Sequence, residues 1–154
     1  MGDNDDDYGP EREFWGHCTN TAWEEQKQYV YASLMGVPVS YWSFEPPGRR
    51  ILDIGGGPVS MLLKVWDLHE GLVIDPIAYP EWTRERYRLA KIGVKVMRAE
   101  EMNETGWDEV WIYNCLQHVV DPAEIVRRAR VSAKVLRICE WIDQPPWEGH
   151  PHML

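Results

Sequence analysis

Apolar residues in the first third of the chain recur at helical spacing. Trp23, Val30 and Leu34 fall on one face of a helix. A Thr-Ala-Trp-Glu run that begins at Thr21 matches a capping box, which marks a helix start. The pattern therefore predicts an N-terminal helix over residues 22–35.

The period changes after residue 48, because five short apolar runs follow that are typical of buried strands. The predicted strands are 50–54, 71–75, 94–98, 108–114 and 134–141. The predicted helices between them are 59–66, 80–93 and one that begins at Asp-Pro-Ala-Glu, residues 121–124, while 37–48 and the stretch before 108 are loops. Strands that alternate with helices predict an α/β fold, a doubly wound sheet of about five parallel strands.

Length and composition agree with one globular domain. The chain has 154 residues, of which 44% are hydrophobic and 27% charged. The formal net charge of −9 disfavours a nonspecific nucleic-acid binder, which would need to neutralise phosphates. Many of the acids lie in residues 1–13, so we expect a disordered acidic tail there.

The compartment follows from what the sequence contains. No run of about 18 apolar residues suggests a membrane span, and the acidic start does not resemble a signal peptide. Three cysteines without a C-x-x-C spacing suggest neither a disulfide framework nor a zinc site, and His150 and His152 alone are weak metal ligands. We expect a cytoplasmic protein without a metal.

Chemically distinctive residues stand where the predicted strands end. In an open parallel sheet, ligands bind outside the carboxyl ends of the strands. The residues at these ends are Asp53, Gly55, Gly56, Gly57, Asp75, Glu100, Glu101, Asn114 and His118. Glycines allow a ligand to approach the backbone, and a carboxylate after the second strand can accept both ribose hydroxyls.

Two cofactor classes use this arrangement. A dinucleotide site needs G-x-G-x-x-G/A and an acid about 20 residues further on, and Gly55, Gly57, Ser60 and Asp75 nearly satisfy it. Asp53 separates the two classes, because a carboxylate there would repel a pyrophosphate and suit a cationic amino-acid group.

Three segments resemble the class I S-adenosylmethionine-dependent methyltransferases. They are residues 51–57 (Ile-Leu-Asp-Ile-Gly-Gly-Gly), 73–75 (Val-Ile-Asp), and 108–122, which runs from Asp-Glu-Val-Trp to His-Val-Val-Asp-Pro. The resemblance extends over residues 49–140 and implies a Rossmann-like core with S-adenosylmethionine as cofactor.

The resemblance also implies a role for each residue. Asp53 and the glycines at 55–57 would hold the methionine end of the cofactor, and Asp75 would hold the ribose. Glu100 or Glu101 would bind the adenine amino group, and Asn114 would lie beside the methyl group that is transferred.

The chain departs from the family pattern in three places. Val59 replaces a third glycine, and Val131-Ser132-Ala133 stands where a Pro-Gly-Gly turn is usual. The family's C-terminal antiparallel strand pair has no counterpart, so we expect a minimal or truncated methyltransferase. Strand 134–141 would then be a sheet edge, covered by the Pro-rich tail 142–154 or by a second subunit in a homodimer.

The sequence contains fewer indications of the residues that would bind the methyl acceptor. His118 follows the fourth strand and is the candidate general base. Residues 14–48 would form the helix, the loop and a lid, with Trp15, His17 and Asn20 facing a small-molecule acceptor. No N-P-P-Y-type run follows the fourth strand, which argues against methylation of DNA bases.

Two other functions compete with methyl transfer. One is a non-catalytic module that binds the cofactor or serves in assembly. The other is a nucleotide-dependent oxidoreductase, and a preference for NAD over S-adenosylhomocysteine would identify it.

Overall fold

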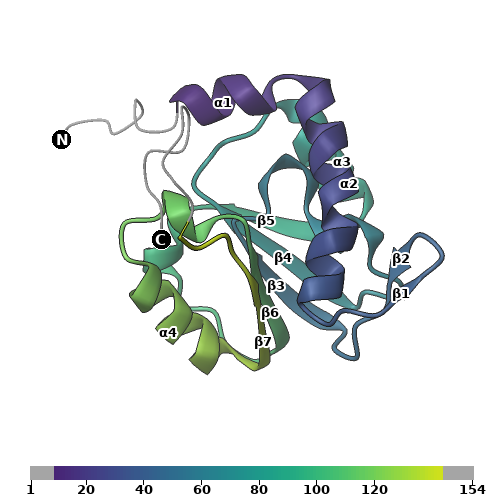
Figure 1. The fold of residues 1–154 in the computed structure, drawn as a ribbon, viewed down its shortest axis with the longest axis vertical. Coiled ribbons are helices and arrows are strands. Elements are labelled where there is room, and N and C mark those ends of the chain that lie inside the picture. The colour runs from purple at the N-terminus through teal and green to yellow at the C-terminus, as the bar shows by residue number, and fades with distance from the viewer. Residues whose placement is uncertain (1–8, 144–154) are drawn as a thin grey trace.

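A central parallel sheet organises the protein, and the computed structural model describes residues 9–143 of it. The strand order is β5-β4-β3-β6-β7, and every neighbouring pair is parallel (Figure 1). The strands are β3 (Arg50–Ile54), β4 (Glu70–Asp75), β5 (Ile92–Val96), β6 (Trp107–Tyr113) and β7 (Ala133–Cys139). The order reverses between β3 and β6, which is where open α/β sheets bind ligands.

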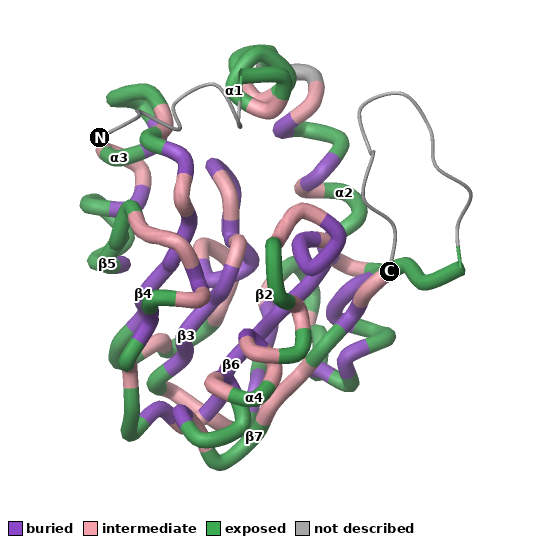
Figure 2. The backbone as a smooth tube through the Cα atoms, turned by 90° about the vertical axis from the view of Figure 1, so that its left-hand side faces the viewer, coloured by how far each residue is buried: buried purple, intermediate pink, exposed green. Residues whose placement is uncertain are grey.

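Helices cover both faces of the sheet. Helices α2 (Cys18–Leu34) and α3 (Glu81–Leu89) lie on one face, and α4 (Pro122–Ser132) lies on the other (Figure 1). A short hairpin, β1 (Val39–Ser40) and β2 (Ser43–Phe44), follows α2. Helix α1 (Gly9–Trp15) lies above one end of the sheet in both Figure 1 and Figure 2.

Alternation along the strands divides the core into two layers. In β3, Leu52 and Ile54 pack in the cluster that includes Ile125 of α4. Ile51 packs in the other cluster, with Tyr31 of α2. The central strands are buried and the edge strand β5 is largely exposed (Figure 2). This is the expected pattern for a sheet covered on both faces.

The α/β architecture and all five predicted strands are confirmed. Strand β5 begins two residues earlier than predicted, because Gly93 lies inside the strand and α3 has already ended at Leu89. The predicted start of α4 is also confirmed. Asp121 caps the helix by accepting a hydrogen bond from the Glu124 amide at 2.9 Å.

The predicted helix 59–66 is wrong. Two 3-10 turns, Gly57–Val59 and Met61–Lys64, occupy this segment. The Ser60 amide donates to the Tyr87 hydroxyl at 2.8 Å, and the Met61 amide donates to the Tyr113 hydroxyl at 3.0 Å. Tyrosines from α3 and β6 therefore satisfy the backbone amides of Ser60 and Met61.

The predicted helix 22–35 exists, but its buried face and its cap were predicted wrongly. Trp23, Val30 and Leu34 are exposed, by 70%, 52% and 65%. The buried positions are Thr21, Glu24, Gln28, Tyr31, Ala32 and Met35. The helix begins at Cys18, so Thr21 lies within it and forms no capping box.

Two further segments differ from the sequence-based expectations. Residues 9–13, expected within a disordered tail, belong to α1. The expected loop 37–48 contains the β1–β2 hairpin, whose pairing joins Val39 to Phe44. Acidic composition and prolines concealed both elements.

Strand β7 is an edge of the sheet, as predicted. The proposed cover, the tail beyond Asp143, lies outside the described residues, as do His150 and His152. No helix within residues 9–143 is long and apolar enough to cross a membrane.

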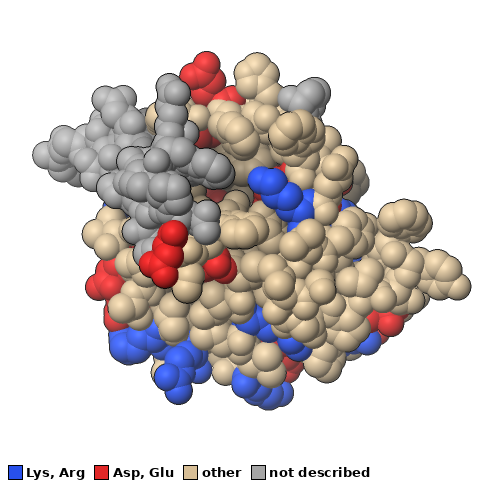
Figure 3. Space-filling view, viewed as in Figure 1, with Lys and Arg blue, Asp and Glu red and all other residues tan. Residues whose placement is uncertain are grey.

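Basic side chains concentrate away from α1. In Figure 3, Lys and Arg gather along the lower edge of the molecule. On α4, both Arg127 and Arg128 form ion pairs with Glu124. Glu124 therefore partly neutralises the basic face of α4.

Candidate functional site

A cavity of about 280 Å³ opens at the carboxyl ends of the parallel strands. Its wall includes Trp15, Gly55, Gly57, Asp75, Glu100, Asn114 and His118 from the sequence-predicted set. Gly56, Asp53, Glu101, His17 and Asn20 are not part of the wall. The topology thus brings together residues that the sequence spreads over about a hundred positions.

The glycine turn after β3 forms the floor. Gly55 and Gly57 have φ values of +73° and +62°, in the left-handed region that favours glycine. A Cβ at Gly55 would lie 2.6 Å from the Cβ of Cys115. The Gly55 amide donates to the Ile74 carbonyl at 2.8 Å, which ties the turn to β4.

Asp75 connects the end of β4 to this turn. Its Oδ2 accepts from the Gly57 amide at 3.1 Å, and its Oδ1 accepts from the Ile77 amide at 2.9 Å. Burial raises the pKa of Asp75 to about 7, although these two backbone hydrogen bonds lower it. The Tyr79 hydroxyl also hydrogen-bonds to this carboxylate, which leaves about one of its four lone-pair sites for a hydroxyl donor from a ligand.

Asp53 lies behind the turn and is fully buried. Its Oδ2 accepts from the Tyr113 hydroxyl at 2.5 Å and from the Ser60 hydroxyl. A Cβ at Gly56 would lie 2.5 Å from the same oxygen, so Gly56 is required for this packing. The resemblance implied direct contact of Asp53 and Gly56 with a cofactor. In this structure they support the turn from behind.

Within residues 9–143, one oxygen of the buried Asp53 carboxylate lacks a hydrogen-bond donor. Its Oδ1 is buried and has no hydrogen-bond partner among the described residues. Burial raises the pKa of Asp53 to about 7, while the hydrogen bonds from Ser60 and Tyr113 lower it and the nearby Asp75 raises it further. Burial, more than the charge of Asp75, thus makes the ionised form of Asp53 costly, and a nearby cation would favour that form.

Glu100 rather than Glu101 lines the cavity. Its Oε1 accepts from the Val120 amide at 3.0 Å, which joins the turn after β5 to the loop before α4. Glu101 is exposed and lies outside the wall. Arg98 and Ala99 complete this side of the cavity.

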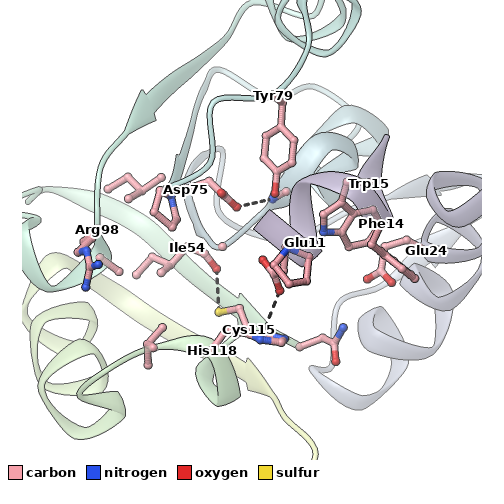
Figure 4. A pocket seen from close by; sticks show the side chains of 18 of the residues that line it. Glu11, Phe14, Trp15, Glu24, Ile54, Asp75, Tyr79, Arg98, Cys115 and His118 are labelled. Atoms are coloured by element: carbon pink, nitrogen blue, oxygen red, sulfur yellow. Dashed lines mark hydrogen bonds and ion pairs between the residues drawn. The ribbon is translucent and has the colours of Figure 1, made fainter. Parts of the chain in front are cut away.

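Helix α1 covers the opposite side. Glu11, Phe14 and Trp15 line the cavity, with Glu24 of α2 beside them (Figure 4). Glu11 Oε1 lies 3.3 Å from His118 Nδ1, so a side chain of the cover contacts the sheet side. Burial raises the pKa of Glu11.

His118 and Asn114 stand next to each other after β6. Asn114 has a φ of +50°, a conformation that asparagine tolerates better than most residues. Gln117 Nε2 donates to Asn114 Oδ1 at 3.3 Å and lies 3.2 Å from His118 Nε2. Both ring nitrogens of His118 thus have neighbours, Glu11 on one side and Gln117 on the other.

The other two residues expected to face the acceptor have different surroundings. His17 is exposed, and Asn20 donates from Nδ2 to the Phe14 carbonyl at 2.6 Å. Asn20 therefore fixes the junction between α1 and α2. Sequence analysis missed Glu11, Phe14, Tyr79 and Cys115, although Glu11 and Trp15 are spaced to share a helix face.

Comparisons with known proteins identify the fold of the chain. No protein-family model matches the sequence, and no curated protein matches it. Several solved structures that contain methyltransferases resemble the chain with TM-scores above 0.5.

One is an S-adenosylmethionine-dependent methyltransferase from Thermotoga maritima, described as a possible histamine N-methyltransferase. It is 18% identical to this chain and has a TM-score of 0.57. The match covers 86% of this chain and 60% of that chain. The plantazolicin methyltransferase BpumL, solved with a pentazolic desmethylPZN analogue and S-adenosylhomocysteine, is 13% identical and has a TM-score of 0.54. The match covers 88% of this chain and 58% of that chain. A methyltransferase in complex with the Haloferax volcanii Trm112 activator is 17% identical, covers 85% and 53%, and has a TM-score of 0.51.

The chain therefore has the Rossmann-like fold of class I S-adenosylmethionine-dependent methyltransferases. It spans between about half and three fifths of the length of these structures. At 13–18% identity, the likeness shows the fold alone.

Proposed function

We propose that this protein is an S-adenosylmethionine-dependent methyltransferase that acts on a small molecule. One observation carries the proposal. The Gly55–Gly57 turn is hydrogen-bonded through the Gly57 amide to Asp75, at the edge of a cavity where the strand order reverses.

The chemistry of the wall fits this cofactor. Its carboxylates suit a ligand that carries a sulfonium and an ammonium group, and Asp75 retains acceptor capacity for ribose hydroxyls. Ile54, Ala99 and Val119 offer apolar surface to an adenine ring. The solved relative with S-adenosylhomocysteine bound has the same fold, which supports the same ligand here.

The same features argue against a nucleotide-dependent oxidoreductase. A pyrophosphate binds at the N-terminus of the helix that follows the glycine turn. Here 3-10 turns replace that helix, and the buried Asp53 would repel the phosphates. The site favours a cation at this position.

Each residue then has a role toward the bound cofactor. S-adenosylmethionine supplies a methyl group that is activated by its attachment to a sulfonium. The Gly55–Gly57 turn and Asp75 would hold the cofactor, Glu100 would face the adenine, and Asn114 would lie near the transferred group. Asp53 would act through the turn that it supports.

Helix α1 and His118 would serve the acceptor. A cavity of 280 Å³ is at the small end for ligand pockets, so α1 would move outward to admit two substrates. Its closure would exclude water and bring Glu11 to His118, which would take up a proton from the acceptor. Tyrosines 87 and 113 would hold the turn in place throughout.

Calorimetric binding of S-adenosylhomocysteine tests the proposal directly. We expect binding to the wild type and none of NAD. Asp75→Asn should weaken binding about 10–100-fold, because a hydrogen bond to a charged group contributes about 1.5–3 kcal/mol. Glu101→Gln removes the same charge outside the cavity and should leave the Kd unchanged. Absence of S-adenosylhomocysteine binding to the wild type would refute the function.

A further inference from the structure

The cavity has two chemically different sides. Arg98, with Ala99, lies on the side of β5, where the proposed function puts the nucleoside. Glu11, Phe14, Trp15 and Glu24 lie together on the helical side (Figure 4). The helical side is therefore the part of the wall available to an acceptor.

Two carboxylates occupy this helical side. Glu24 is buried, and burial raises its pKa; it pairs with Lys27 at 3.5 Å. The Glu11 side chain is 29% exposed and has the His118 ring 3.3 Å away. Glu11 is thus the carboxylate on α1 that lies closest to a group able to accept a proton.

Two aromatic rings accompany the carboxylates. Phe14 and Trp15 contact each other edge to face, with centroids 4.9 Å apart. Aromatic faces attract cations and pack against flat apolar groups. A carboxylate beside such rings is suited to an amine with an aromatic body, because its ammonium group would meet the charge and its ring would meet the aromatic residues.

We propose, building on the methyltransferase function, that the acceptor is an aromatic primary amine whose ammonium group is bound by Glu11. His118 contacts the same carboxylate, with its Nδ1 3.3 Å from Oε1 of Glu11. The residue that recognises the charge and the residue that removes the proton are therefore adjacent.

The transfer balances with these groups. An ammonium proton passes to a ring nitrogen of His118 and then to water, which leaves a lone pair on the amine. That lone pair forms the bond to the methyl carbon while the carbon–sulfur bond breaks, and its electron pair stays on sulfur. The positive charge moves from sulfur to the methylated nitrogen.

The test compares amines with neutral analogues of the same shape. Phenethylamine and tryptamine are the probes, and 2-phenylethanol and tryptophol are their counterparts, with label transfer from methyl-labelled S-adenosylmethionine as the readout. We expect methylation of at least one amine and a rate at least about tenfold lower for its alcohol, because the alcohol carries no positive charge to pair with Glu11 and its oxygen is the weaker nucleophile. Equal rates, or methylation of neither amine, would overturn the amine proposal.

Variants of α1 test whether Glu11 binds the amine. Glu11→Gln should raise the KM for the amine about tenfold or more and leave the Kd for S-adenosylhomocysteine unchanged. Glu13→Gln, on the same helix and outside the cavity wall, carries the same charge change and should alter neither. An unchanged KM in Glu11→Gln would exclude this residue. If the wild type does not bind S-adenosylhomocysteine, the methyltransferase function itself would be refuted.

Discussion

Carboxyl groups at the two ends of the central sheet have pKa values shifted in opposite directions. At the carboxyl ends, Asp53 and Asp75 are buried and meet only neutral donors, so the pKa of each rises to about 7. At the amino ends, Asp108 accepts from Lys134 at 3.0 Å and from the backbone of Arg50 at 3.0 Å. The Lys134 hydrogen bond, followed by those from the backbone, lowers the pKa of Asp108 to about 2.

Glu109 shows how completely the amino end is paired. Its side chain is fully buried, yet it accepts from Arg137 at 2.7 Å, from Trp111 at 2.8 Å and from the Gly48 amide at 2.9 Å. Burial raises the pKa of Glu109, but these hydrogen bonds outweigh it and the net pKa is lowered. The amino end thus pairs its carboxylates with cations, whereas among the described residues Asp53 and Asp75 accept hydrogen bonds only from uncharged hydroxyl and amide groups.

Breaking the buried pair at the amino end should give the largest effect on stability. Arg137→Met leaves Glu109 buried without its cation and should lower the free energy of unfolding by about 3–5 kcal/mol. Urea denaturation measures the change. Lys134→Met, which removes an 81% exposed partner of Asp108, should cost no more than about 1 kcal/mol.

The double variant Glu109→Gln with Arg137→Met separates charge from packing. It should recover most of the loss, since no unpaired charge remains buried. A loss below about 1 kcal/mol in Arg137→Met would show that the amino end does not depend on this pair.

Two glycines allow the ends to be compared by the same substitution. Gly55→Ala places a methyl group 2.6 Å from Cys115 Cβ at a positive φ, so it should cost about 2–4 kcal/mol and weaken S-adenosylhomocysteine binding. Gly48→Ala places one 2.5 Å from Glu109 Cγ and should cost about 1–3 kcal/mol without changing the Kd. Denaturation and calorimetry measure both. Equal loss of binding in Gly48→Ala would mean that the ends are coupled.

The strands and the strand-end residues were predictable because their signals are local. Continuous apolar runs identify buried parallel strands, and the reversal of strand order brings their carboxyl ends together. The sequence therefore sufficed to predict that Asp75 and the glycine turn lie together, as they do in the cavity wall. The capped start of α4 was equally local, since the Asp-Pro-Ala-Glu run contains all of its determinants.

The failures arose where distant residues decide the local structure. Residues 59–66 form 3-10 turns because hydroxyls of Tyr87 and Tyr113 bind their backbone. Helix α2 buries Gln28, whose Nε2 donates to the Val59 carbonyl, and leaves Trp23 exposed. A hydrophobic pattern could not predict that a polar side chain would be selected to satisfy a turn.

The two ends should also respond to pH with opposite signs. The folded-state pKa of Asp53 lies near 7, above its ordinary value of 3.8, so the folded protein binds this proton more tightly than the unfolded chain. Proton binding by Asp53 therefore stabilises the folded state at low pH, and this stabilisation is lost as the pH rises through about 7. For Asp108, with a lowered pKa, stabilisation is present above its ordinary pKa and is lost as the pH falls toward 2.

Asp53→Asn isolates the carboxyl end. Between pH 5 and pH 8, linkage predicts that one such carboxyl costs roughly 2–3 kcal/mol of stability, and the variant should lose this part of the slope. Urea denaturation at several pH values measures it, with Asp67→Asn, an exposed position, as the control. Bound S-adenosylhomocysteine should change the slope in the wild type more than in Asp53→Asn, because its ammonium group stabilises the charged carboxylates. A wild-type slope identical to that of Asp53→Asn would contradict the raised pKa of Asp53.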